Sequence, residues 1–478
     1  MVVKAAALKG FRDLLPGEML ARERIISTIR NVFERYGFVP LSTPALEHRD
    51  VLLGYGEEAS KQIYLFTDPD EADVGLRFDL TAPLSRVVAE HRDLPRPFKR
   101  YQVQPVWRYD KPDPGRFREF LQFDIDTVGT DSRMADAEIV AAMHDCLEAL
   151  GLDFRIRYSS RNVMNALVSL LGLEAGMVKP VLRIVDKLDK QGLENVKLEL
   201  GPGRTDESGA EIEGLGLSGD RIAIIERFLG IRGETRRETI DEVQNMLAGA
   251  DGAELGVGDL AEIDRFLTVM GVSDERVVVD PSIARGLDYY TGPVFEAILT
   301  GKKLERFGSV MGGGRYDGLI EVFTGERTPA TGASIGVDRL LAAMRTAGLA
   351  GTKPSTADVI VTVMDRERVE RYQEIASELR TAGFNTELYL GKQKSIGKQL
   401  KYADRQEIPV AVIAGSDEFE RGEVSIKDLR VIKETTVEIE ERSEWVEQKV
   451  GQVTVKRSAM IGEIRHMLPA RGEQRRDA

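Results

Sequence analysis

Residues 101–129 read YQVQPVWRYDKPDPGRFREFLQFDIDTVG, and this stretch decides the fold class. Its two ends, YQVQPVWRYD and FLQFDIDTVG, show the alternation of side chains that is typical of strands. The residues between them, KPDPGRFRE, hold two prolines, one glycine and charges of both signs, a composition that suits a mobile exposed loop. We therefore expect an antiparallel hairpin of two long strands whose loop can grip a ligand.

The sequence before the hairpin mixes helical and extended patterns. An amphipathic stretch from Glu18 to Tyr36 ends at Gly37 and predicts a helix. The next residues, FVPLSTPALE, predict an extended segment that Pro40 and Pro44 interrupt.

The sequence after the hairpin changes pattern three times. Helical stretches such as AIIERFLG and ETIDEVQNMLAG, separated by a glycine-rich segment, indicate an inserted and mostly helical module. Glycine-rich and strand-like sequence then resumes and leads into the helical GVDRLLAAMRTAG. Beyond the spacer LAGTKPSTA, strands alternate with helices, which indicates a small α/β domain.

These changes divide the chain into five expected parts. We expect a catalytic core in 1–169, a mostly helical insertion in 170–275 and the core continued in 276–350. A small α/β domain follows in 355–450, and 451–478 is a C-terminal extension whose tail, ARGEQRRDA, we expect to be disordered.

Composition restricts the class of protein. The chain has 478 residues, of which 42% are hydrophobic and 30% charged, and no apolar run reaches the about 18 residues that span a bilayer. The start, MVVKAAALKGF, lacks the long apolar region of a secretion signal, so we expect a cytoplasmic protein without membrane association. Cys146 is the one cysteine, which excludes an internal disulfide and suggests a core position. The net charge of −13 leaves only local basic patches for nucleic acid.

Common catalytic motifs are absent from the sequence. None of the four histidines lies in a glycine-rich segment, which disfavours histidine acid–base chemistry. The sequence has no histidine or cysteine pair with metal-ligand spacing and no G-x-x-x-x-G-K-[ST] loop. Hydrolases and P-loop enzymes are therefore disfavoured.

Four arginines stand in apolar or glycine-rich segments, where an unpaired charge is costly. Several guanidinium groups that converge would form an anion site for a polyphosphate substrate. The alternative is that each arginine forms a structural salt bridge with a nearby aspartate, and for any single arginine we favour this alternative. The arginines are Arg108, Arg285, Arg315 and Arg339, and the aspartates are Asp110, Asp288, Asp317 and Asp338.

Three segments in order resemble the signature motifs of class II aminoacyl-tRNA synthetases. GFVPLSTPALE, with Pro44, resembles motif 1, WRYDKPDPGRFREFLQFDID resembles motif 2 and GASIGVDRLL resembles motif 3. RGLDYYTGPVFE at 285–296 and GGGRYDGL at 312–319 are similar to signatures of the histidyl-tRNA synthetase family.

The resemblance extends to both ends of the chain and is weakest in the helical insertion. KGFRDLLPGE fits the family's N-terminus, and GKQKSIGKQLKYADRQEIPVAVIAG looks like its anticodon-binding domain. The resemblance implies an α/β protein with an α+β catalytic core. That core is an antiparallel sheet flanked by helices, with a helical insertion and a C-terminal α/β anticodon-binding domain.

The resemblance also implies a two-step reaction and its partners. L-Histidine would react with ATP, accompanied by Mg²⁺, to give histidyl-adenylate, and the histidyl group would then pass to the 3′ end of tRNA(His). Catalysis would rest on positioning and charge stabilisation, with no protein nucleophile. A homodimer would form through motif 1.

The family's site residues carry over onto positions of this sequence. Arg285, the principal catalytic cation, would act with Arg108 and Arg339. Arg116 would join these three in binding ATP, and no residue is expected to ligate a metal. The implied histidine site consists of Asp79, Leu80, Thr81, Arg108, Gln122, Asp126, Arg285, Tyr289, Tyr290 and Tyr316.

Within that site, the implied roles divide by the part of histidine that is held. Asp126, Tyr289 and Tyr290 would hold the side chain, and Tyr316 would close the pocket. Asp79, Thr81 and Gln122 would hold the α-amino group. Without the motif context, the two tyrosines would be a half-buried strand pair and Asp126 a strand-end salt bridge. The eukaryote-like branch of the family has Asp where many bacterial members have Glu at positions 79 and 126, so the match is to that branch.

Basic side chains of the C-terminal domain are candidates for tRNA phosphates. A solvated lysine face is an equally good interpretation of the same residues. They are Lys392, Lys394, Lys398 and Lys401.

Two other functions compete with the synthetase. A catalytically inactive paralogue, the histidine-binding regulatory subunit of ATP phosphoribosyltransferase, usually lacks the anticodon-binding domain and has degraded motifs. A class II synthetase for another amino acid would share motifs 1 to 3 but not RGLDYY and GGGRYDG.

Overall fold

The computed structural model describes residues 5–53, 60–111, 115–206, 209–283, 289–301, 303–351, 353–392, 395–430 and 451–468. The chain forms two compact units. The larger comprises Met1–Asp13 with Arg22–Ala350, and the smaller comprises Leu14–Ala21 with Gly351–Ala478. Within the described residues, no helix has the length and apolar character that crossing a membrane requires.

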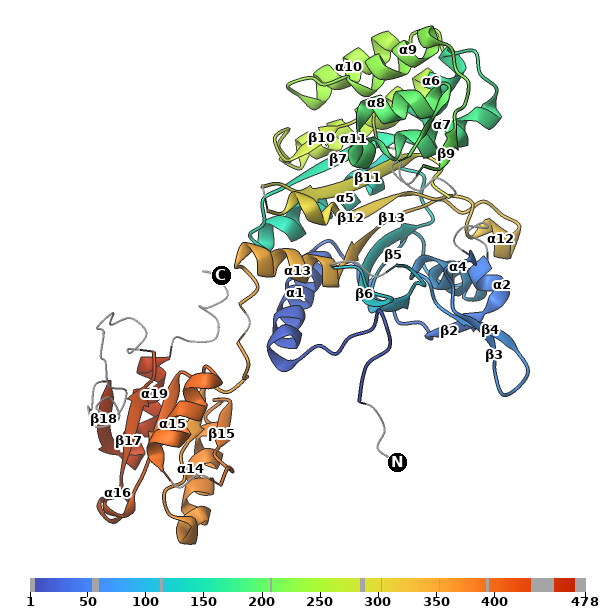
Figure 1. Ribbon diagram of the computed structural model, residues 1–478. Helices are drawn as coiled ribbons and strands as arrows, with labels where there is room; N and C mark the ends of the chain where they lie inside the picture. The colour runs from blue at the N-terminus through green and yellow to red at the C-terminus, as the bar shows by residue number, and fades with distance from the viewer. Residues whose placement is uncertain are drawn as a thin grey trace. The chain divides into compact units, whose positions relative to one another are not determined.

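An eight-stranded sheet is the centre of the larger unit (Figure 1). Its neighbouring strands run antiparallel except at the two edges, where β1 is parallel to β5 and β10 is parallel to β7. In spatial order the strands are β1 (Val39–Pro40), β5 (Phe98–Trp107), β6 (Glu119–Val128), β13 (Ala330–Gly336), β12 (Ser309–Arg315), β11 (Pro293–Leu299), β7 (Phe154–Ser160) and β10 (Val277–Val279).

The expected hairpin is confirmed as β5 and β6. The two strands pair antiparallel from Phe98 opposite Val128 to Trp107 opposite Glu119. Within its connecting loop, residues 112–114 lie outside the described part of the chain. The hairpin therefore supplies the second and third strands of the eight-stranded sheet.

One face of β6 belongs to the hydrophobic core. Phe123 and Ile125 are fully buried, and the Phe123 ring meets Phe33 of α1 (Pro16–Arg35) edge to face at 5.2 Å. The predicted helix from Glu18 to Tyr36 is thus confirmed. Cys146 is buried within α5 (Arg133–Ala149), which confirms its core position.

Shorter elements surround the sheet. A three-stranded sheet carries the end of the expected extended segment, which is divided between β1 and β2. Its strands are β2 (Leu46–His48), β4 (Asp73–Leu76) and β3 (Leu65–Thr67). The remaining elements are α2 (Arg49–Leu52), α4 (Thr81–Glu90), η3 (Glu305–Phe307), α12 (Glu321–Thr324) and α13 (Val337–Ala347).

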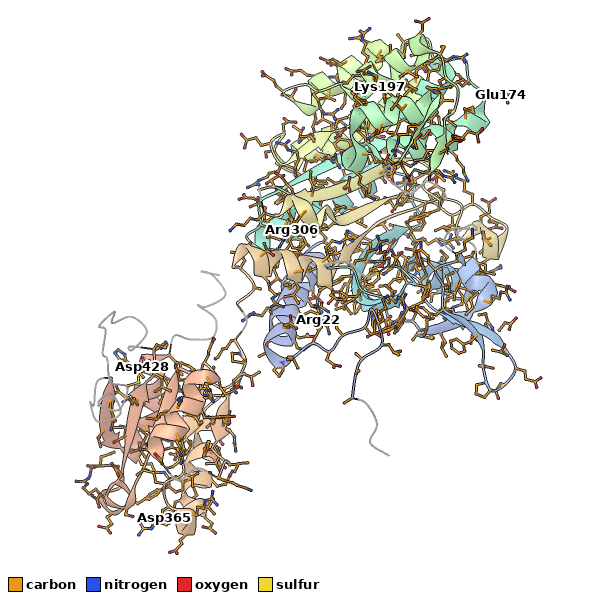
Figure 2. All side chains as sticks on the ribbon, viewed as in Figure 1. Arg22, Glu174, Lys197, Arg306, Asp365 and Asp428 are labelled. Atoms are coloured by element: carbon orange, nitrogen blue, oxygen red, sulfur yellow. The ribbon has the colours of Figure 1, made fainter. Side chains whose placement is uncertain are left out.

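Helices dominate the residues between β7 and β10 (green in Figure 1). They are α6 (Arg161–Leu170), η2 (Ala175–Met177), α7 (Val178–Val185), α8 (Leu188–Leu200), α9 (Gly219–Leu229), α10 (Arg236–Met246) and α11 (Ala253–Val269). The glycine-rich segment between α8 and α9, expected only as a separator, folds into a small sheet of β8 (Gly203–Thr205) and β9 (Glu211–Glu213). Lys197, labelled in Figure 2, lies on α8 and pairs with Glu226 of α9 at 3.2 Å.

The smaller unit is an α/β fold around a five-stranded sheet, as the alternating pattern predicted. β15 (Thr386–Leu388), β14 (Val359–Val361) and β16 (Val410–Ile413) are parallel, whereas β17 (Glu423–Asp428) and β18 (Gln452–Lys456) are antiparallel. Its helices are η4 (Arg366–Arg368), α14 (Val369–Thr381), α15 (Ile396–Arg405), α16 (Ser416–Arg421), η5 (Arg457–Ala459) and α19 (Met460–Met467).

The residues after 450 complete this smaller unit. β18 pairs with β17, and Met460 and Ile464 of α19 are buried in the same core. The segment expected as an extension therefore supplies the last strand of the sheet. The tail from residue 469 onward, including the part expected to be disordered, lies outside the described residues.

Candidate active site

A cavity of about 300 Å³ opens in the larger unit over the polar face of β6, β12 and β13. Most of the residues expected to bind histidine or ATP line this cavity. They are Asp79, Thr81, Arg108, Arg116, Gln122, Asp126, Tyr289, Tyr290, Tyr316 and Arg339.

Among the expected site residues that the structure describes, only Leu80 does not line the cavity. Leu80 is fully buried beside it, and its carbonyl oxygen accepts a hydrogen bond of 3.2 Å from Nη2 of Arg100. Arg285 lies outside the described residues, as does the rest of 284–288.

The alternation of β6 makes the floor of the cavity polar. Gln122, Asp124 and Asp126 stand two residues apart and so point to one face of the sheet, while the residues between them face the core. Gly332 of β13 lies opposite Asp126. A Cβ atom on Gly332 would collide with Oδ1 of Asp126, so this glycine leaves room for the carboxylate.

Arg100 is the fully buried partner of Asp126 that the sequence analysis missed. It stands opposite Asp126 in the β5–β6 register, and its Nη2 lies 2.7 Å from Oδ2 of Asp126. The hydroxyl of Tyr316 donates a hydrogen bond to the other carboxylate oxygen. The signal was present in the sequence, because Arg100, Gln102 and Gln104 alternate along β5 as the acidic residues do along β6.

Burial dominates the electrostatics of the floor. It raises the pKa of Asp126 to about 7, although Arg100 opposes the rise, and the neighbouring Asp124 adds to it. Burial raises the pKa of Asp124 to about 6. The pKa values of Tyr289 and Tyr316 are raised well above their usual range by burial, so both remain neutral hydroxyl groups. The floor thus offers buried carboxyl groups beside neutral hydroxyl groups.

The two tyrosines of the RGLDYY segment pack on each other and on the glycine-rich strand. Their ring centroids are 4.3 Å apart, and the hydroxyl of Tyr289 donates to that of Tyr290 at 3.1 Å. A Cβ atom on Gly314 would lie 2.9 Å from the Tyr290 ring, so glycine permits this contact. The GGGRYDG segment therefore shapes the cavity by its lack of side chains.

Polar groups along one wall are connected by hydrogen bonds. Oδ1 of Asp79 accepts from the backbone N–H groups of Thr81 and Ala82, both at 3.1 Å, at the start of α4. Nη2 of Arg108 donates to Oε1 of Gln122 at 3.3 Å, and its Nε donates to a backbone oxygen at 3.0 Å. This wall combines a carboxylate, an amide oxygen and a guanidinium group.

The four arginines that the sequence singled out have different surroundings. Arg108 and Arg339 line the same cavity. Arg315 is buried and pairs with Asp136 at 2.7 Å, so for this arginine the salt bridge is confirmed, with a different main partner from the expected Asp317 at 3.8 Å. Arg285 lies outside the described residues.

The aspartates expected beside Arg108 and Arg339 instead pair with other arginines. Asp110 pairs with Arg116 at 2.6 Å, and Asp338 pairs with Arg12 at 2.9 Å. Arg22 of α1, labelled in Figure 2, lies 3.8 Å from the same Asp338 carboxylate. Nη1 of Arg339 donates to the backbone oxygen of Ser309 at 2.7 Å. Of these arginines, Arg108, Arg116 and Arg339 line the cavity.

Histidine and lysine side chains lie elsewhere. None of the four histidines is among the residues that line the cavity. In the smaller unit, Lys392, Lys398 and Lys401 are exposed near the start of α15, and Lys394 lies outside the described residues. Across the described ranges, no group of three or more His, Cys, Asp or Glu side chains is placed to hold a metal ion.

Comparison with known proteins covers both units. The family model of histidyl-tRNA synthetases matches residues 10–340, and that of an anticodon binding domain matches residues 358–449. A histidine–tRNA ligase of Paracoccus denitrificans is 46% identical over 97% of this chain and 98% of its own length. One from Rhizobium meliloti is 44% identical over 100% of this chain and 98% of its own.

A solved structure agrees with these sequence matches. The crystal structure of histidyl-tRNA synthetase from Nostoc sp. is 34% identical, covers 98% of this chain and 100% of its own, and superposes with a TM-score of 0.81. The strand order, the cavity and the full-length matches lead to one assignment. The chain belongs to the histidyl-tRNA synthetase family.

Proposed function

We propose that the cavity of the larger unit is where this histidine–tRNA ligase activates L-histidine with ATP before transfer to tRNA(His). The carrying observation is that one cavity joins a buried carboxylate and tyrosine pair, Asp126 and Tyr316, to the guanidinium groups of Arg108 and Arg339. Such a cavity matches a ligand with an imidazole at one end and phosphates at the other.

The deep end of the cavity would select the imidazole. A neutral imidazole has one N–H donor and one nitrogen acceptor. Asp126 would accept from the N–H group, and Tyr290, which itself accepts from Tyr289, would present its proton to the other nitrogen. An apolar amino acid would leave these buried groups unpaired, and a site of this kind rejects such ligands strongly.

The wall beside α4 would hold the α-amino group. Asp79 offers a carboxylate, Thr81 a hydroxyl and Gln122 an amide oxygen, and all three line the cavity. An ammonium group forms short charge-assisted hydrogen bonds with such acceptors. Leu80 would contribute only its buried position behind this wall.

The arginine-rich end would stabilise phosphoryl transfer. A carboxylate oxygen of histidine forms a bond to the α-phosphorus of ATP, and the bond from that phosphorus to the pyrophosphate oxygen breaks. Arg108 would contact the α-phosphate and the histidine carboxylate, while Arg339 and Arg116 would contact the distal phosphates. Arg285 is proposed to hold the α-phosphate from the opposite face. Charge stabilisation of this kind needs no side-chain nucleophile.

We propose that Mg²⁺ accompanies ATP and neutralises charge on its phosphate oxygens. Asp110 and Asp338 are the carboxylates that line this end, and both already pair with arginines. The metal would therefore be held mainly by phosphate oxygens and water, with these two carboxylates near it.

The remaining proposals concern the whole protein. The 3′-terminal ribose of tRNA(His) would take the histidyl group, and the lysines near α15 would meet tRNA phosphates. Motif 1 would form a homodimer, which sedimentation can test, and the protein would act in the cytoplasm. The ranges 1–169, 170–275, 276–350 and 355–450 stay proposals, and the described residues after 450 add strand β18 to the last of them. Asp79 and Asp126 support the eukaryote-like branch of the family, which also stays a proposal.

Charging of tRNA tests the proposed site. We expect the chain to esterify histidine, and no other amino acid, to tRNA(His) with ATP. Arg339→Met should slow charging by roughly 10²–10³-fold, the usual effect of removing one preorganised donor. Arg345→Met should not slow it, because Arg345 is an exposed residue of the same helix that does not line the cavity. Equal loss in both variants, or charging of another amino acid, would contradict the proposal.

A further inference from the structure

Asp124 is a buried acidic residue of the cavity floor to which the activation chemistry assigns no task. Its side chain lines the cavity although the residue is only 2% exposed. Nε2 of Gln122 donates to both of its carboxylate oxygens, at 3.0 and 2.9 Å. Ser334 of β13 also forms a side-chain hydrogen bond with Asp124. The carboxylate is therefore fixed from two sides.

Gln122 lies between two charged groups of opposite sign. Asp124 contacts the amide nitrogen, and Nη2 of Arg108 donates to the amide oxygen at 3.3 Å. An ionised carboxylate only accepts hydrogen bonds, and a guanidinium group only donates them. If the amide turned by half a rotation, its oxygen would face Asp124 and its NH₂ group would face Arg108. Both contacts would then be repulsive, so the two neighbours determine one orientation.

That orientation matters for the substrate. An amide oxygen has two lone pairs, of which Arg108 uses one, so a second donor can be accepted. An amide turned the other way would present N–H donors to the ammonium group of histidine, and two donors cannot bond. We propose that Asp124 is a positioning residue, which orients the Gln122 amide so that its oxygen accepts from the α-ammonium group. This inference rests on the proposed role of Gln122.

Two histidine analogues separate this role from a general disturbance of the floor. Histidinol keeps the amine and the imidazole, whereas 3-(imidazol-4-yl)propanoate keeps the imidazole and the carboxylate but has no amine. Calorimetry of the full-length chain measures the affinity for each. Asp124→Val removes every acceptor while keeping a residue that suits a strand. Asp124→Asn keeps one acceptor for Gln122 and is the conservative variant.

We expect Asp124→Val to weaken histidinol binding roughly ten- to hundredfold, the usual effect of losing a charged hydrogen bond. Binding of the propanoate should change by less than about twofold, because it has no amine for the misoriented amide to repel. Asp124→Asn should restore much of the histidinol affinity. Ser334→Ala, which removes a contact to Asp124 without touching Gln122, should leave the ratio of the two affinities unchanged.

A double-mutant cycle with Gln122→Met completes the test. Residues that act through each other give non-additive effects. We therefore expect the double variant to bind histidinol no more weakly than Gln122→Met alone. Additive losses would mean that Asp124 acts on the ligand independently, and equal losses for both analogues would mean a disturbed floor. Either outcome overturns the inference. If Gln122→Met itself causes no amine-specific loss, the proposed role of Gln122 fails and the inference fails with it. An amine-specific loss in Gln122→Met but not in Asp124→Val overturns the inference alone.

Discussion

The charge of Asp126 depends on its surroundings more than on its own chemistry. Burial raises its pKa from 3.8 to about 7, against the opposing effect of Arg100. Because the pKa is higher in the folded chain, folding takes up a proton between these two values. The contribution of Asp126 to stability is therefore fully present below about pH 4 and is lost as the pH rises through about 7.

Replacing Asp126 by Asn removes this proton uptake. We expect the stability of the variant relative to the parent chain to increase by up to about 1.4 kcal/mol per pH unit between roughly pH 5 and 7. Chemical denaturation of the ligand-free chain at several pH values measures the difference. Asp93→Asn, in an exposed segment, is the matched control and should show no such trend. A difference for Asp126→Asn that is constant with pH would contradict the expectation.

Arg339 allows a test of charge stabilisation at a single residue. We expect Arg339→Met to slow histidine-dependent exchange of pyrophosphate into ATP by roughly 10²–10³-fold, the usual effect of removing one preorganised donor. Arg345→Met, on the same helix but exposed, should stay within about twofold, as surface substitutions usually do. An exchange rate in Arg339→Met within about twofold of the parent chain would contradict a role in the chemical step.

At the scale of residues, motif similarity identified the site residues whose chemistry is distinctive. It missed the residues that act by holding other side chains in position. Arg108, Gln122 and Asp126 were predicted and line the cavity. Arg100 and Asp124 were missed, although both alternate with core residues on the same two strands. Alternation shows on which side of its own strand each residue lies. Only the pairing of β5 with β6 shows which residues stand opposite it.

At the scale of elements, α11 contains two glycines with opposite surroundings. A Cβ atom on Gly256 would lie 2.7 Å from the backbone nitrogen of Val163 in α6, whereas a Cβ atom on Gly258 would meet nothing within 4 Å. Gly256 therefore permits close approach of two helices, and Gly258 only adds flexibility to the unfolded chain.

These two glycines predict opposite effects of one substitution. Gly258→Ala should stabilise the folded chain by about 0.5–1 kcal/mol, because alanine loses less entropy in a helix. Gly256→Ala should destabilise it by about 1–3 kcal/mol through overpacking. Denaturant unfolding of the two variants measures both effects. Destabilisation by both substitutions would show that the packing of α11 differs from this description.

Long elements were predictable from the sequence and short ones were not. The helical periodicity of α1 and the alternation along β5 and β6 each extend over many residues. The local pattern was therefore enough to predict these elements. β8 and β9 have three residues each and exist because they pair with each other in a glycine-rich segment. β18, placed beyond the expected domain, depends on the partner strand β17 in the same way.

At the scale of the whole molecule, a net charge of −13 limits how nucleic acid can be bound. Long-range attraction would be weak, so tRNA affinity would depend on local lysine and arginine patches. Such binding releases counterions and therefore weakens steeply with salt, whereas a small ligand held in a cavity is affected little.

Salt dependence separates tRNA binding from amino acid activation. Between 50 and 200 mM salt, we expect the KM for tRNA(His) to rise at least about tenfold, as for a protein that neutralises several phosphates. The KM for histidine in pyrophosphate exchange should change by less than about twofold, because its charges are held by buried groups. Steady-state kinetics at both salt concentrations provide the comparison. Parallel changes in both constants would contradict a separate, patch-based tRNA site.

Pyrophosphate exchange in the absence of tRNA tests the central claim most directly, because it reports on the cavity alone. The chain is incubated with ATP, labelled pyrophosphate and each of the twenty amino acids in turn. We predict exchange with histidine and with no other amino acid. Histidine binding without exchange would contradict the claim and would instead fit a histidine-binding regulatory protein.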